Sequence, residues 1–146
     1  MGATGGKMSE CFPSVTVTGF DDKQDAAAIR RAALRTLSGL GCRRLSVDIF
    51  TMERKEAVRL NRKFRGKAYA ADVLSFPLPS PVPGGVVGEI LLRPSPVARL
   101  AAFPGFTRRK RLARLAVHGV LHVLGYGHDD PEQARIMRAL ERASGG

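Results

Sequence analysis

The 146-residue sequence predicts an α+β fold, a small mixed β-sheet with helices packed on it. Short segments with the apolar alternation of strands are interleaved with longer segments of helical apolar spacing. Too few of them form clean β-α-β units for a doubly wound sheet. A hydrophobic content of 44% supports a core that folds without a disulfide or metal. We predict a flexible lead-in over residues 1–8 and a single domain over residues 9–146.

Four short segments have the residue pattern of strands, the first two by alternation of apolar and polar residues and the last two by short apolar runs. They cover residues 14–20, 43–50, 72–79 and 86–93. The third segment carries Pro77 and Pro79, and proline cannot donate a hydrogen bond to a neighbouring strand. We therefore expect this strand to lie at an edge of the sheet or to end there.

Four longer segments place apolar residues at helical spacing and carry capping residues at their ends. They cover residues 21–41, 51–66, 108–125 and 130–144. The first helix is expected to begin at Asp21 or Asp22 and to end at Gly39 or Gly41, and the second to begin at Thr51 and end at Gly66. The third is expected to end at Gly125, and the fourth to begin at Asp130, with Pro131 at its first helical position. The residues expected on the buried face of the third helix are Leu112, Leu115, Ala116, Val120, Val123 and Leu124.

The chain is strongly basic, with a net charge of +11 and a pI near 10.8. Such a charge favours binding to a polyanion, nucleic acid first, although a solvated basic surface in a compositionally biased chain is the alternative. Two basic runs could guide a polyanion, at residues 54–67 and 108–114. The second begins a helix, where cations are unfavourable unless an anion such as a bound polyanion offsets them. Aromatic residues make up only 6% of the chain, so we expect phosphate contacts to dominate and base stacking to be minor.

The two cysteines, Cys11 and Cys42, are far apart and form no C-x-x-C pair, as in a reducing compartment. The first residues contain no apolar segment typical of a secretory signal, and no window is long enough for a transmembrane helix. These observations predict a cytoplasmic protein without a membrane partner.

All three histidines of the chain fall within residues 118–128, at His118, His122 and His128. Two imidazoles four residues apart share one face of a helix, and Gly125 lets the chain turn the third towards them. Three neutral imidazoles with an open fourth position are typical of catalytic zinc, although other divalent ions share these ligands. Ordinary buried histidines are the alternative, but clustering at ligand spacing favours one Zn²⁺ per chain, held on a helix and the following turn.

The spacing also matches the zinc proteases that carry H-E-x-x-H-x-x-G-x-x-H, with one departure. Gly119 stands where these proteases have the glutamate that serves as general base. A protease function is therefore disfavoured.

Two segments together resemble a known family. Residues 118–130, HGVLHVLGYGHDD, resemble the H-G-x-L-H-L-x-G-Y-D-H signature of the YbeY endoribonucleases. Residues 60–77, LNRKFRGKAYAADVLSFP, resemble the family's L-N-x-x-Y-R-x-K-x-x-x-T-D-V-L-S-F-P, and GEI at residues 88–90 resembles its G-D-I strand. The chain departs from these patterns at Phe64, Ala71 and Gly127; Asp129 or Asp130 could replace the acid that the family has at position 127.

The resemblance implies a zinc-dependent endoribonuclease that prefers single strands and acts in 16S rRNA 3′-end maturation and ribosome quality control. Its partners would be ribosomal RNA and the small ribosomal subunit, with ribosomal proteins or a GTPase left open. The resemblance also implies a catalytic role for Arg65 in the FRGK stretch; the alternative is one more surface cation in a basic run. A guanidinium suits this chemistry because it binds two phosphate oxygens at once.

No general base is identifiable from the sequence. For Asp72 a structural role is preferred, by pairing with Arg65 or capping a turn, and for Ser75 a bond to the backbone. Two other functions remain open: a ribosome-associated RNA-binding factor with a structural metal, and a metal hydrolase of another phosphoester or an amide. The basic charge disfavours the small substrate of the latter.

Overall fold

The computed structural model describes residues 14–40, 45–81, 83, 85–94, 108–127 and 130–145. Within them the chain forms four strands and four helices, which confirms the predicted α+β class. In chain order these are β1 (Ser14–Thr18), α2 (Lys23–Gly39), β2 (Leu45–Thr51), α3 (Arg54–Arg65), β3 (Val73–Leu78), β4 (Val86–Leu92), α5 (Arg108–Val123) and α6 (Pro131–Gly145). The predicted lead-in over residues 1–8, Cys11 and Cys42 lie outside the described residues.

The sheet is mixed and has the strand order β1-β2-β4-β3. β1 pairs with β2 and β2 with β4 in parallel, whereas β3 pairs with β4 in antiparallel fashion. The predicted edge position of the proline-containing strand is confirmed: Pro77 pairs with Gly88 on one side only. An edge strand tolerates proline because the missing N–H would have faced away from the sheet.

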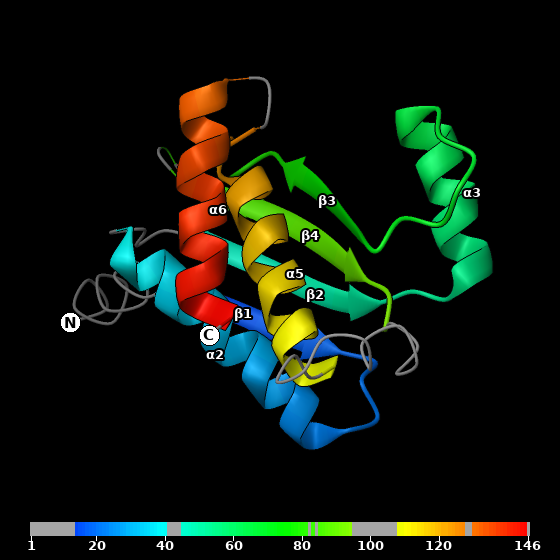
Figure 1. Ribbon diagram of the computed structural model, residues 1–146, viewed down its shortest axis with the longest axis horizontal. Helices are drawn as coiled ribbons and strands as arrows, with labels where there is room; N and C mark the ends of the chain where they lie inside the picture. The colour runs from blue at the N-terminus through cyan, green and yellow to red at the C-terminus, as the bar shows by residue number, and fades with distance from the viewer. Residues whose placement is uncertain are drawn as a thin grey trace.

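Three helices, α2, α5 and α6, lie together on one face of the sheet, whereas α3 stands at its side (Figure 1). The main core fills the space between the sheet, α2 and α5. Its buried members are Val15, Ile29, Ala33, Leu37, Leu45, Val47, Ile49, Ile90, Leu92, Leu112, Ala116, Val120 and Val123. The face predicted for the third helix is thus confirmed, with Leu115 and Leu124 half-buried at its border.

Helix α5 packs on the sheet through two glycines that leave room for opposing side chains. A Cβ at Gly88 would lie 2.6 Å from Val123 Cγ1, and one at Gly119 would lie 2.7 Å from Ile90 Cγ2. Real Cβ atoms do not approach so closely, so the helix could not approach β4 to this distance with any larger residue. This contact sets the depth at which His118 and His122 lie.

We expect Gly119→Ala to lower the free energy of unfolding by about 1–3 kcal/mol, because Ile90 is fully buried and cannot move aside. Urea unfolding measures the effect. The matched control is Gly39→Ala at the end of α2, where a Cβ meets nothing within 4 Å. That control should be neutral or slightly stabilising, since alanine is the better helix former. Equal stability of Gly119→Ala and the wild type would contradict the close packing.

The predicted helix ends are mostly confirmed. Asp22 caps α2 by accepting hydrogen bonds from the backbone N–H groups of Gln24 and Asp25, which lower the pKa of its carboxyl group. Gly66 ends α3 in the left-handed conformation, with φ 67°. The third confirmed cap is Asp130, whose carboxylate accepts from the Glu132 N–H at 3.0 Å.

The Thr51 cap is wrong. Thr51 is the last residue of β2, its hydroxyl donates to the Gly19 carbonyl at 3.3 Å, and Glu53 stands at the N-cap instead. The sheet pairing of Thr51 with Leu92 therefore outweighs its local capping preference.

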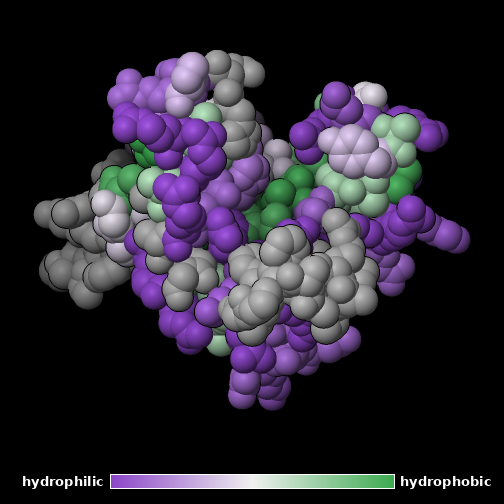
Figure 2. Space-filling view, in the orientation of Figure 1, coloured by the Kyte–Doolittle hydropathy of each residue, from purple (hydrophilic) through white to green (hydrophobic). Residues whose placement is uncertain are grey.

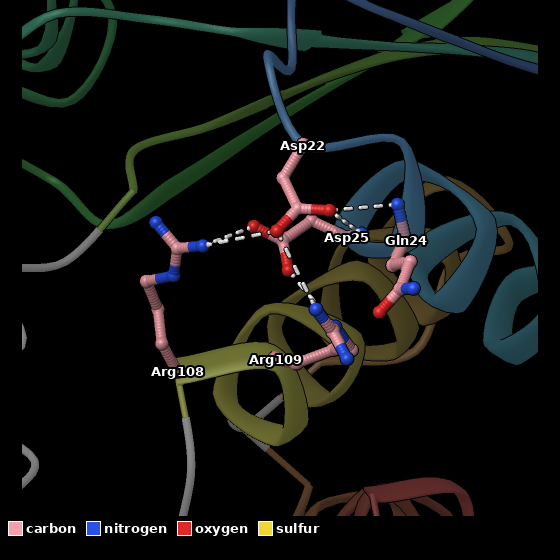
Figure 3. Close-up of polar contacts among 5 residues, drawn as sticks. All are labelled: Asp22, Gln24, Asp25, Arg108 and Arg109. Carbon is pink, nitrogen blue, oxygen red and sulfur yellow. Dashed lines mark hydrogen bonds and ion pairs between the residues drawn. The ribbon is translucent and has the colours of Figure 1, made fainter.

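The basic first turn of α5 meets the acidic first turn of α2 (Figure 3). Arg108 donates to Asp25 at 2.6 Å, and Arg109 donates to both Asp25 at 3.0 Å and Asp22 at 3.4 Å. The Asp25 side chain is only 5% exposed, and a carboxylate buried to this extent needs an opposite charge nearby. The two guanidinium groups supply that charge. Carboxylates of the chain itself thus offset the charges of Arg108 and Arg109 at this helix start.

None of the helices in the described part of the chain combines the length and apolarity needed to cross a lipid bilayer.

Candidate metal and RNA cleavage site

His118 and His122 lie on one stripe of α5, and their imidazoles converge. The two Nε2 atoms are 2.9 Å apart and the ring centroids 4.5 Å apart, with the rings at 71°. Both side chains are half-buried. Two ring nitrogens at this distance require a proton or a cation between their lone pairs.

Glu141 of α6 holds the other side of His118. Its Oε2 atom lies 2.9 Å from His118 Nδ1, and the two side chains are 17% and 23% exposed. A carboxylate on Nδ1 favours the tautomer that carries its proton there and leaves the Nε2 lone pair directed at His122. A carboxylate behind a histidine in this way is the usual outer partner of a zinc-ligating imidazole.

These donors fit a zinc ion. Two nitrogens bound to one tetrahedral zinc lie roughly 3.3 Å apart, given bond lengths of about 2.0–2.1 Å. The observed Nε2 separation of 2.9 Å needs only a small rotation of either ring. The predicted third ligand, His128, lies outside the described residues, as does Asp129. No set of three candidate ligands forms within the described ranges, so the third ligand stays a prediction.

Two adjacent cavities, each of about 460 Å³, lie beside the histidines. Both are lined by Arg65, Val73 and His118, so the predicted arginine and a predicted metal ligand border the same space. The space lies between α5 and α6 on one side and the end of α3 on the other. Figure 2 shows this hollow with hydrophobic residues at its floor, mainly hydrophilic residues on the α6 side and a mixture of both on the α3 side.

Arg65 reaches the cavities from the last turn of α3. Gly66 ends the helix directly after it and turns the chain away. Among the described residues, no carboxylate pairs with Arg65, and its side chain is exposed. Its guanidinium can therefore donate to a phosphate.

Asp72 does not pair with Arg65. Its carboxylate bridges two other arginines, Arg93 at 3.3 Å and Arg111 at 2.5 Å. The pairing that the sequence left open with Arg65 is therefore wrong, while a structural role for Asp72 agrees with these ion pairs. The bridge holds Arg111 of α5 at the wall of the first cavity, next to Arg114.

Ser75 donates a hydrogen bond from its hydroxyl to the Gly119 carbonyl at 3.1 Å, as expected for a backbone contact. Gly119 stands where the zinc proteases carry their catalytic glutamate, and the packing leaves little room for a larger residue there. A Cβ at this position would lie 2.7 Å from Ile90 Cγ2 and 3.1 Å from the Ser75 hydroxyl oxygen.

The departures from the YbeY patterns lie in three different surroundings. Ala71 is buried in the cluster that joins α3 to the sheet, whereas Phe64 is exposed. The N–H of Gly127 donates to Gln133 Oε1 at 3.3 Å. Asp130 caps α6, so its carboxylate is engaged there.

The sequence reasoning missed Glu141 and the cavity position of Arg111. Glu141 follows Met137 by four residues on the buried side of α6, where an apolar residue is the norm. Arg111 precedes His118 by seven residues and so shares its helix face. Both positions can be found in the sequence. Their meaning becomes clear only when it is known which element packs against α6 and which against α5.

The comparisons with known proteins identify the family of the chain and agree with its fold. The family model described as Endoribonuclease YbeY matches residues 16–144. The chain is 40% identical over 123 residues to the Endoribonuclease YbeY of Stenotrophomonas maltophilia, covering 80% of this chain and 76% of that protein. It is 38% identical over 107 residues to that of Neisseria meningitidis, covering 69% of this chain and 63% of the relative, less than two thirds of its length.

A solution structure from Thermotoga maritima is similar in fold. It matches with a TM-score of 0.58 and 24% identity, over 90% of this chain and 86% of that one. The family model spans most of the sequence, and both described sequence relatives carry its name. The chain therefore belongs to the YbeY endoribonuclease family.

Proposed function

We propose that this protein is a zinc-dependent endoribonuclease that cuts single-stranded RNA in the cytoplasm. Its substrate would be ribosomal RNA, in 16S rRNA 3′-end maturation and ribosome quality control. His118, His122 and His128 would hold the zinc, and Arg65 would act on the scissile phosphate. The observation that carries the proposal is the shared cavity wall. In a chain of this family, the histidine pair and an arginine that pairs with no carboxylate of the described residues border one space.

The chain's own residues supply most of the chemistry in this proposal. Zinc bound by the histidines would supply Lewis-acid chemistry to a phosphodiester. Arg65 would donate two hydrogen bonds to the equatorial phosphate oxygens, where negative charge grows in the transition state. Glu141 would keep the His118 ring oriented and its Nε2 unprotonated. Arg111 and Arg114 would attract neighbouring phosphates along the first cavity.

The test is cleavage of a labelled single-stranded RNA carrying the 3′ end of a small-subunit rRNA, before and after a chelator removes the metal. We expect cleavage to be lost and then restored by zinc, while circular dichroism shows that the fold is retained. The retained fold separates a catalytic from a structural metal, because a structural zinc contributes directly to folding.

Two outcomes would contradict this proposal. Unfolding on metal removal would favour the RNA-binding factor with a structural metal. Cleavage that survives complete removal of the metal, measured by mass spectrometry, would assign the activity to a contaminating ribonuclease.

Glu141→Gln is expected to weaken zinc binding about 10- to 100-fold, because the neutral amide no longer favours the His118 tautomer that leaves Nε2 free. Competition with a chromophoric chelator measures the affinity. Glu132→Gln in the first turn of the same helix is the matched control, since that side chain is 72% exposed and pairs only with Arg135 among the described residues. Equal zinc affinity of the two variants would remove Glu141 from the site.

A further inference from the structure

Two large aromatic side chains are exposed at the rims of the two cavities. Phe64 is 55% exposed and borders the second cavity, and Tyr69 is 57% exposed and borders the first. The other large hydrophobic side chains exposed in the described part of the chain, Leu78 and Ile136, line neither cavity. Arg65 lines both cavities and so stands between the two rings along the hollow.

Contacts with neighbouring residues hold the Phe64 ring and the backbone of Tyr69. The Phe64 ring packs edge-on against Phe76 of β3, with centroids 5.1 Å apart at 71°. The backbone at Tyr69 is tied down by Asn61, a fully buried residue of α3 whose Nδ2 donates to the Tyr69 carbonyl at 2.9 Å. This hydrogen bond from a buried amide stabilises the conformation of the surface loop that carries the exposed Tyr69 ring.

We propose that Phe64 and Tyr69 stack on the unpaired nucleobases that flank the phosphate at Arg65, one base on each side. This proposal rests on the proposed function. It adds the two residues that would make the site select single-stranded over double-stranded RNA. A base is a flat apolar surface joined to a charged backbone. The hollow offers one ring at each cavity, with Arg65 bordering both cavities. Stacking needs a free base face, which a duplex does not present outside its helix ends.

For base stacking, the position of the aromatic residues matters more than their small number. Aromatic residues make up only 6% of the chain, which by itself predicts minor stacking. Two exposed rings beside one arginine suffice for one dinucleotide step, because base stacking on an aromatic side chain changes affinity by roughly 5- to 150-fold per base. The arginines of the first cavity supply the matching charge for the backbone.

The test compares the dissociation constants of two labelled ligands of equal length and charge, a single-stranded RNA and an oligonucleotide made entirely of abasic residues. Fluorescence anisotropy measures both, and a gel confirms that the RNA stays intact. The proteins are the wild type, Phe64→Leu, Tyr69→Leu and the double variant. Tyr69→Phe keeps the ring, and Ile136→Ala is the control for an exposed apolar residue elsewhere. Thermal unfolding verifies that each variant is folded.

We expect the wild type, Tyr69→Phe and Ile136→Ala to prefer the RNA over the abasic ligand at least tenfold. Each leucine variant should lose about fivefold or more of this preference, and the double variant nearly all of it. A preference that survives in the double variant would overturn the proposal. Equal affinity of the wild type for both ligands would also overturn it, while leaving RNA binding and cleavage standing. No binding of either ligand by the wild type would reject the proposed function itself.

Discussion

Arg65→Ala is expected to reduce RNA cleavage about a hundred- to a thousandfold while zinc content and stability stay at the wild-type level. The magnitude is that of removing one preorganised donor to charge that develops in a transition state. The side chain is exposed and pairs with no carboxylate among the described residues, so its loss should leave the fold unchanged. Single-turnover cleavage of the rRNA-derived substrate measures the effect.

Two further variants distinguish a specific role for Arg65 from general charge. Arg62→Ala removes an exposed cation three residues earlier on the same helix, and Arg62 borders neither of the two cavities. We expect it to change cleavage by less than about threefold, through weaker phosphate attraction alone. Arg65→Lys should fall between the wild type and the alanine variant, because an ammonium keeps the charge but lacks the planar pair of donors. Equal losses at positions 62 and 65 would contradict a specific role.

His122→Ala is expected to abolish cleavage, by at least about a thousandfold, together with stoichiometric zinc binding. The reason is geometric: His122 Nε2 is one of the two nitrogens that converge at 2.9 Å, and alanine leaves His118 alone in this part of the site. Mass spectrometry of the native protein measures the zinc content. The free energy of unfolding of the metal-free protein should change little, since the side chain is half-buried beside a cavity.

His122→Cys is the informative partner of this variant, because a thiolate also binds zinc. We expect it to regain part of the zinc content, which a general packing defect at position 122 would not allow. If His122→Ala still cuts RNA at the wild-type rate, the cleavage comes from another site or from a contaminant.

The sequence by itself determined the local features of this protein. Alternation located β1 and β2, short apolar segments located β3 and β4, and Pro77 placed β3 at an edge. Asp22, Gly66 and Asp130 act at helix ends as expected, because caps and left-handed stops depend on only a few neighbouring residues. The spacing of His118 and His122 likewise guaranteed a shared helix face, since helical periodicity is local.

Only the tertiary structure decided which distant groups meet. Asp72 pairs with Arg111, 39 residues away, and Asp25 pairs with Arg108, 83 residues away. Glu141 reaches His118 because α6 packs on α5, and Gly119 is required because α5 packs closely on Ile90. Every arginine in a basic run looks alike in the sequence. Which of them neutralises an internal carboxylate, and which borders the cavity, depends on how helices and sheet pack, and no short segment encodes that packing.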